Sequence, residues 1–151
     1  MDVGSHRLDL IAYWLGEPES VAGVTGNLCM SYDVPDVETL ICRMHSGCHV
    51  VCGTGWAMGN SFDEMEIHGT EGSIVATPFD GQELVLRRGG AEEEVELPPQ
   101  MPNVHLPLVA SFSARVGAGE APEFDGVDGM QATRIISAAY RSQGTGAWEK
   151  A

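Results

Sequence analysis

An aspartate and a histidine stand four residues apart at the start of the sequence, Asp2 and His6. Ser5 is a good helix N-cap, so we expect His6 to be the first residue of the helix that follows. Free backbone amides and the positive end of the helix dipole disfavour a protonated imidazole there, which leaves a ring able to accept a proton. Asp2, joined through a flexible Val3-Gly4 link, could orient that ring or hold a hydroxyl group. The simpler alternative is that Asp2 caps the helix and His6 is a surface residue, because a single D-x-x-x-H is a weak signal.

A second candidate is a cluster of metal-ligating residue types between positions 42 and 52. Its members are Cys42, His45, Cys48, His49 and Cys52. With Ser46-Gly47 as a two-residue hairpin turn, strand alternation puts His45, Cys48 and Cys52 on one face and Cys42 and His49 on the other. A closed zinc site needs four ligands together. We therefore predict no metal site and interpret the cysteines as small buried hydrophobic residues.

Three further residues are of types that contact polar ligands. Asn103 and His105 precede a predicted helix, on a loop whose side chains can line a cleft. Trp56 follows a predicted strand and could stack on a sugar-like ligand, although a core or interface role is the alternative. No glycine-rich phosphate loop follows a strand and opens a helix, so we predict no cofactor-binding residue in this sequence.

The periodicity of apolar residues predicts the elements that carry these groups. A helix is predicted over residues 5–15, with a stripe made of Leu8, Ile11, Ala12 and Leu15. From about residue 19 the period changes to two, and six or seven strands follow with tight connections, including turns at Ser46-Gly47 and Gly89-Gly90. After Pro98-Pro99 two more helices are predicted. The first has a stripe of Leu108, Val109, Phe112 and Val116, and the second covers residues 127–142, with Ile135, Ile136, Ala139 and Tyr140 facing inward. This order predicts an α+β fold, a predominantly antiparallel open sheet with helices on one face.

Apolar residues occupy both faces of the predicted strands, as Leu40-Ile41 and Val50-Val51 show. One face of the sheet is covered by the helices, so the other needs a second cover. We expect the chain to form a homo-oligomer through this open face.

The composition limits the classes of partner. The 151 residues carry a net charge of −14, with 22 acidic and 8 basic residues, which would repel a phosphate backbone or an anionic membrane. No apolar run approaches the roughly 20 residues that cross a bilayer. The charged residues near the start do not fit a signal peptide. We therefore expect a cytoplasmic protein with reduced cysteines and without nucleic-acid or membrane partners.

Three stretches together resemble the C-terminal domain of the Gfo/Idh/MocA oxidoreductases, whose namesakes include glucose–fructose oxidoreductase and inositol dehydrogenase. MDVGSHRLDLIAYWLGEPESVAG resembles the family's D-x-G-x-H segment with its helix and first strand. MEIHGTEGSIVA resembles its mid-sheet signature. NVHLPLVASF and DGVDGMQATRIISAAYRSQGTG resemble its two closing helices. The likeness covers nearly all of the sequence, in the family's order.

The resemblance implies a role within a two-domain dehydrogenase. In the family, a Rossmann domain binds NAD or NADP and supplies a catalytic lysine, while the C-terminal domain supplies the substrate pocket. The aspartate and histidine of D-x-G-x-H correspond to Asp2 and His6, and the histidine resembles a proton acceptor for a substrate hydroxyl. The resemblance also implies a sugar- or polyol-type substrate and oligomerisation through the sheet.

We accordingly expect residues 1–151 to form a single C-terminal domain without the N-terminal Rossmann domain. Such a chain would be inactive alone, because hydride transfer needs a held cofactor. A separate Rossmann-domain subunit is then a possible partner. Two alternatives stay open: a non-catalytic dimeric module that binds a ligand or partner, and a small metal-binding protein built on the cysteine cluster.

Overall fold

Three helices and seven strands make up the part of the chain that the computed structural model describes, residues 2–56, 59–60, 62–81 and 83–151. The helices are α1 (Asp2–Leu15), α2 (Leu106–Gly117) and α3 (Gly126–Thr145). The strands are β1 (Pro18–Gly26), β2 (Val37–Met44), β3 (His49–Gly55), β4 (Met65–Gly69), β5 (Gly72–Ala76), β6 (Leu84–Arg88) and β7 (Ala91–Glu94). Every pair of neighbouring strands among these is antiparallel. The predicted α+β class is confirmed.

The strands are divided between two sheets, where the sequence analysis expected one. The first sheet has the order β1-β2-β3 and the second the order β4-β5-β6-β7. They belong to different compact units: Met1–Ala57 together with Ala118–Ala151, and Met58–Gly117. The first unit therefore contains α1 and α3, and the second contains α2.

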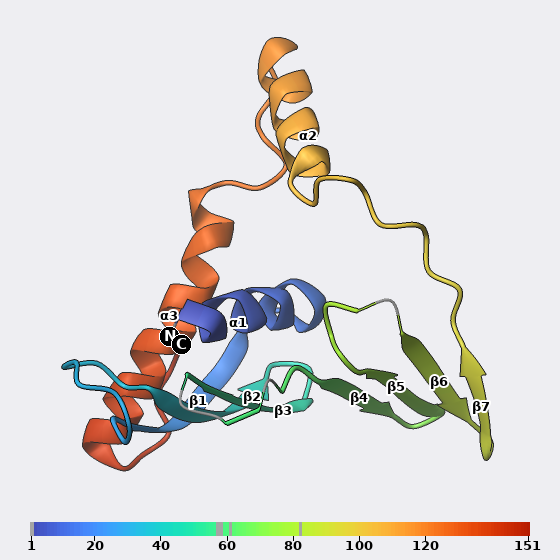
Figure 1. Cartoon of the computed structure of the whole chain (residues 1–151). Coiled ribbons are helices and arrows are strands. Elements are labelled where there is room, and N and C mark those ends of the chain that lie inside the picture. The colour runs from blue at the N-terminus through green and yellow to red at the C-terminus, as the bar shows by residue number, and fades with distance from the viewer. Residues whose placement is uncertain (1, 57–58, 61, 82) are drawn as a thin grey trace. The chain divides into compact units, whose positions relative to one another are not determined.

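The core of the first unit lies between its sheet and its two helices. Burial alternates along β2, so that Leu40, Cys42 and Met44 face inward. Leu8 of α1 and Ile135 of α3 cover them and are fully buried. Figure 1 shows α1 and α3 beside this sheet, and both helices contact it and each other. The stripe predicted for the first helix is confirmed, since all four of its members pack in this core.

The last helix follows the prediction with one exception. Asp125 and Asp128 form a capping box at its start, and Gly146 ends it in the left-handed conformation. Ile135 and Ala139 are buried as expected. Tyr140 was expected to face inward, but it is 41% exposed. The helix packs closely on β1 at Gly23, where an added Cβ would lie 2.9 Å from the Cβ of Ala139.

The first hairpin has a longer turn than predicted. The amides of Met44 and Gly47 donate to the carbonyls of Cys48 and Met44, so the loop contains three residues, 45–47. Gly47 has a φ of 86°, which suits the left-handed position that closes a loop of this length. Compared with a two-residue turn, the extra residue shifts the pairing of β2 with β3 by one residue. Cys42 therefore lies on the same face as Cys52, and the face assignment made from a two-residue turn is wrong.

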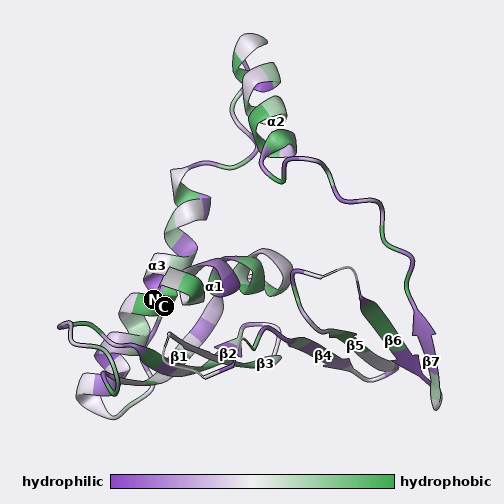
Figure 2. Cartoon of the chain, viewed as in Figure 1, coloured by the Kyte–Doolittle hydropathy of each residue, from purple (hydrophilic) through white to green (hydrophobic). Residues whose placement is uncertain are grey.

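The second unit contains a four-stranded meander and α2. Its hairpin at Gly89-Gly90 is confirmed, because Arg88 pairs with Ala91 and both glycines have positive φ. Figure 2 shows the contrast between the apolar β6 and the hydrophilic edge strand β7. The predicted stripe of α2 exists but is not buried: Leu108, Val109, Phe112 and Val116 are each at least half exposed. No helix in the described ranges is long and apolar enough to cross a bilayer.

A buried carboxylate shapes the loop between β1 and β2. Asp36 is 1% exposed, and its Oδ1 accepts a hydrogen bond from the amide of Leu28 at 2.8 Å. Its Oδ2 accepts from the amides of Cys29 and Met30 at 2.7 and 2.8 Å. These bonds favour the ionised form and lower the pKa of the Asp36 carboxyl. The loop conformation therefore depends on that negative charge.

We predict that Asp36→Asn lowers the melting temperature by several degrees at neutral pH, because an amide offers one acceptor oxygen where the carboxylate offers two. Since the native pKa is depressed, the stabilisation is complete above the unfolded value of about 3.9 and is lost as the pH falls through the native value. The melting difference between the two proteins should accordingly shrink in acid. Thermal unfolding followed by circular dichroism at several pH values measures it. Asp33→Asn, on the exposed part of the same loop, is the control, and an equal effect there would contradict the prediction.

Candidate functional site

The first helix begins at Asp2, three residues earlier than the sequence predicted. Ser5 is therefore not its N-cap, and His6 lies in the second turn, where its amide is bonded within the helix. Positions 2 and 6 are one turn apart on one side of α1, and His6 is exposed. The side chain of Asp2 lies outside the described residues.

Gly4 lies between these positions and faces the opposite side of the helix, where it is buried. A Cβ at Gly4 would lie 2.7 Å from Oε1 of Glu38 and 3.3 Å from Oγ1 of Thr54. The first turn of α1 thus approaches the sheet more closely than a side chain would allow. The expected flexible Val3-Gly4 link is wrong, because this contact holds the segment as helix.

Beneath Gly4, a buried carboxylate and a hydroxyl face each other across two strands. Glu38 of β2 is 5% exposed and pairs with Thr54 of β3. The Thr54 hydroxyl donates a hydrogen bond to Oε1 of Glu38. The sequence analysis did not single out either residue. The available signal was that Glu38 has the same parity as the inward-facing Leu40 and Cys42, which is unusual for a charged residue.

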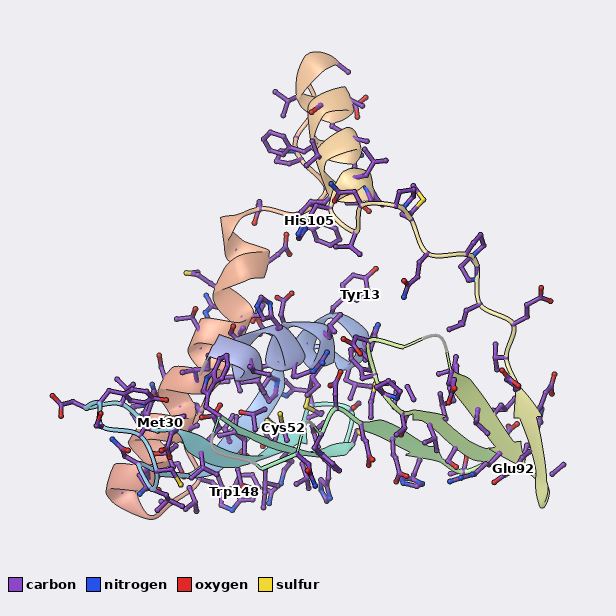
Figure 3. All side chains as sticks on the ribbon, viewed as in Figure 1. Tyr13, Met30, Cys52, Glu92, His105 and Trp148 are labelled. Atoms are coloured by element: carbon purple, nitrogen blue, oxygen red, sulfur yellow. The ribbon has the colours of Figure 1, made fainter. Side chains whose placement is uncertain are left out.

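Two further side chains experience the charge of Glu38. Burial raises the pKa of the Cys52 thiol, the Glu38 charge raises it further, and Arg7 of α1 opposes them. Burial and then Glu38 raise the pKa of Tyr140 of α3. Figure 3 shows Cys52 between α1 and the sheet. The polar cluster under the first turn of α1, defined by Gly4, Arg7, Glu38, Cys52, Thr54 and Tyr140, therefore draws on both helices and two strands.

Burial disfavours the thiolate form of Cys42 and Cys52 in the first sheet. Burial, and then the nearby Cys52, raises the pKa of Cys42 to about 11. A thiol is reactive as its thiolate, which such a shift suppresses. All four cysteines are free, and Cys42 packs in the hydrophobic core with Cys52 beside it. Within the described ranges, no three His, Cys, Asp or Glu residues are grouped as a metal ion would need.

The other predicted site residues lie in two different units. Trp56, in the first unit, is 52% exposed, and its amide donates to the carbonyl of Asp36 at 2.8 Å. Asn103 and His105 are exposed residues of the second unit. Oδ1 of Asn103 accepts from the amide of His105 at 2.9 Å, which organises the turn leading into α2. Figure 3 shows His105 at the start of that helix. That Trp56, Asn103 and His105 contact a substrate stays a prediction.

An open hollow of about 340 Å³ lies at one end of the four-stranded sheet and contains none of the predicted site residues. His68, Ser73, Arg87 and Glu92 form a row across its four strands. Its arginines already have partners, since Arg87 bonds Glu92 at 2.8 Å and Arg88 bonds Glu71 at 2.7 Å. We interpret this hollow as a solvated surface.

The contact at Gly4 yields a test of the site's architecture. Glycine-to-alanine changes within helices usually stabilise by about 1 kcal/mol, whereas an extra methyl group in a tight contact costs about 1–3 kcal/mol. Glu38 could move away only by leaving its buried hydrogen bond with Thr54. We therefore expect Gly4→Ala to lower the free energy of unfolding by about 1 kcal/mol, measured by urea denaturation.

The matched control for this change is Gly144→Ala in α3, where a Cβ would have no neighbour within 4 Å. It should raise the free energy of unfolding by up to about 1 kcal/mol. A gain of the same size at Gly4 would show that the first turn of α1 does not press on the sheet.

Comparisons with known proteins agree with this fold. The family model for the GFO/IDH/MocA C-terminal domain matches residues 1–75, about half of the chain. No curated protein gives a significant match. Many solved structures match this chain, and the three described next share its architecture over almost all of it.

Three of these structures illustrate the likeness. The aldose-aldose oxidoreductase of Caulobacter crescentus, complexed with glycerol, is 24% identical with a TM-score of 0.85, over 98% of this chain and 46% of its own. An oxidoreductase from Agrobacterium radiobacter, in complex with NAD+, L-tartaric acid and magnesium, is 20% identical with a TM-score of 0.81, over 99% and 48%. The WlbA dehydrogenase of Bordetella pertussis, in complex with NADH and UDP-GlcNAcA, is 20% identical with a TM-score of 0.76, over 99% and 43%.

At these identities the structural matches establish the fold, and the chain spans about half the length of the proteins it matches. The family model adds the segment that contains Asp2, Gly4 and His6. The resemblance inferred from sequence is thereby confirmed. The chain belongs to the GFO/IDH/MocA family and carries the C-terminal domain of oxidoreductases of that type.

Proposed function

We propose that this chain is the substrate-binding part of an NAD(P)-dependent oxidoreductase that acts on sugar- or polyol-type substrates, with Asp2 and His6 at the site. The observation that carries the proposal is the construction of the first turn of α1. It sets positions 2 and 6 on one side of the helix while Gly4 anchors the other side against Glu38.

His6 is the proton acceptor in this proposal. Its exposed imidazole can accept a hydrogen bond, and then the proton, from a substrate hydroxyl. Asp2 orients the ring or holds a second hydroxyl. Trp56, Asn103 and His105 are the proposed further substrate contacts. The ligands named for the similar structures include glycerol and L-tartaric acid, which both carry hydroxyl groups on neighbouring carbons.

The described residues do not fit a dinucleotide. Dinucleotide-binding folds hold the pyrophosphate at a helix N-terminus that follows a strand of a parallel sheet. All strand pairs in the described part of this chain are antiparallel. The proposal therefore assigns NAD or NADP to a Rossmann-type domain or subunit.

Ligand titration of the purified chain tests the proposal. We expect glycerol and L-tartrate at millimolar concentrations to perturb NMR signals of α1 near His6, and His6→Ala to abolish the effect. His68→Ala removes an exposed histidine in the second unit and should leave binding unchanged. NADH should show no saturable binding to the chain alone. Perturbations that survive His6→Ala, or tight NADH binding, would contradict the assignment.

We also propose that the outer face of the first sheet joins two copies of the chain. Ala22, Ile41 and Val51 form a row across its three strands on the face away from the helices. Ile41 is 41% and Val51 73% exposed, which is high for large apolar side chains. Arg43 lies on the same face with its guanidinium 5.0 Å from the ring of Trp148. This surface supports self-association, and it would serve equally in a non-catalytic dimeric module.

A charge placed in that row should separate the copies. We expect Val51→Glu to convert an oligomer to a monomer in sedimentation velocity experiments, because two carboxylates would be buried at the symmetric contact. Thr70→Glu, at an exposed turn of the second unit, adds the same charge elsewhere and should leave the assembly intact. A wild-type chain that is monomeric throughout the measured concentration range would contradict the proposal.

A further inference from the structure

Glu38 is a carboxylate at a place where the sheet otherwise buries apolar side chains. It is 5% exposed and shares the inward face of β2 with Leu40, Cys42 and Met44. Burying a charge is costly unless hydrogen bonds and opposite charges compensate it. Asp36, another buried acid, uses its charge on three amides of its own loop. The groups that face Glu38 therefore show what its charge does.

Those groups come from three elements packed around the carboxylate. Thr54 of β3 donates its hydroxyl to Oε1. Gly4 of α1 is close enough that a Cβ would lie 2.7 Å from the same oxygen. Burial raises the pKa of the Cys52 thiol, Glu38 raises it further and Arg7 of α1 lowers it, so both charges act on the same thiol. Tyr140 of α3 also experiences the charge of Glu38, because burial raises its pKa and Glu38 raises it further.

Glu38 packs against α1 at a particular place, the N-terminal turn. Gly4 belongs to the first turn, whose backbone amides have no partner within the helix and which carries the positive end of the helix dipole. A carboxylate is favoured there, and it stabilises the turn in return. A neutral residue of the same shape would fill the space without that attraction.

We propose that Glu38, bonded by Thr54 and packed against Gly4, is a positioning residue that holds the first turn of α1 on the sheet and thereby sets the places of Asp2 and His6. The positioning of Asp2 and His6 for a substrate rests on the proposed function. The ordering of the first turn of α1 by Glu38 does not, because it concerns the helix alone. Asp2 and His6 occupy the start of the chain's first helix, where ends commonly fray, and Glu38 supplies the anchor.

Amide hydrogen exchange measures the anchor directly. The amide of His6 is bonded to the carbonyl of residue 2 in the helix, so its protection reports closure of the first turn. We expect Glu38→Gln to speed exchange at His6 and Leu8 by roughly tenfold while exchange at Ile135 in α3 stays unchanged. Glu66→Gln, an exposed acid of β4, is the matched control and should change neither.

Substitutions at Thr54 separate the hydrogen bond from general damage to the fold. Thr54→Val keeps the shape and removes the hydroxyl, so exchange at His6 should rise. Thr54→Ser restores the hydroxyl and should restore protection. The titration of Tyr140 offers a spectroscopic check, because removing the Glu38 charge should lower its pKa. Unchanged exchange at His6 in Glu38→Gln, or an equal rise in α3, would overturn the inference.

Ligand binding distinguishes this inference from the proposed function. If both hold, Glu38→Gln should weaken L-tartrate binding by roughly tenfold without abolishing it, since His6 remains but is less well placed. If the wild-type chain binds no polyhydroxy ligand while Glu38→Gln still loosens the first turn of α1, the proposed function fails and the anchor stands. If wild type binds and Glu38→Gln binds equally well, Glu38 does not set the place of His6, and its positioning role fails.

Discussion

The close approach of the first turn of α1 to the three-stranded sheet is the constraint on which the candidate site depends. It exists because Gly4 has no side chain and because a buried carboxylate, Glu38, occupies the space below it. Without that contact the segment would be a helix end with two polar side chains, of the kind that frays. With it, the turn joins the core that Leu8 continues into the sheet. The glycine of the D-x-G-x-H segment is thus explained by a distance to a neighbouring strand.

Two acids on the same stretch of chain, Asp36 and Glu38, show two ways to compensate a buried charge. Asp36 accepts three backbone amides of the preceding loop and holds that loop in one conformation. Glu38 accepts a hydrogen bond from the hydroxyl of Thr54 on the next strand and packs against Gly4 in the first turn of α1. At Asp36 the charge orders loop backbone that regular secondary structure leaves without partners, and at Glu38 we propose that it orders the first turn of α1. The first unit therefore combines an apolar core with two polar anchors at its margin.

The proposed function divides the chemistry between this chain and a second, dinucleotide-binding domain or subunit. In the proposal, this chain presents an imidazole and hydroxyl-binding groups on an antiparallel scaffold, and another domain or subunit holds NAD or NADP. The solved structures that share its fold are about twice its length, which is consistent with a site completed by another domain. Rigid placement of the substrate-facing groups matters more in such a divided site, because each half must present its groups in the geometry that the other requires.

Local patterns in the sequence determined the α+β class, the three helices, the Gly89-Gly90 turn and the family. Each depends on residues close together in the chain, whose periodicity or turn chemistry acts locally. The assignment of Asp2 and His6 to the site also came from the sequence, and it stays a prediction. Only the tertiary structure decided that α1 begins at Asp2, because the reason is a contact between Gly4 and a strand more than thirty residues away. The tertiary structure likewise decided that Cys42 and Cys52 lie on the same face of the sheet. One extra residue in a turn moves every side chain of the following strand to the opposite face. Glu38 and Thr54 became visible as a pair only when the strands were brought into register, because hydrogen bonds across a sheet leave no periodic trace in either strand alone.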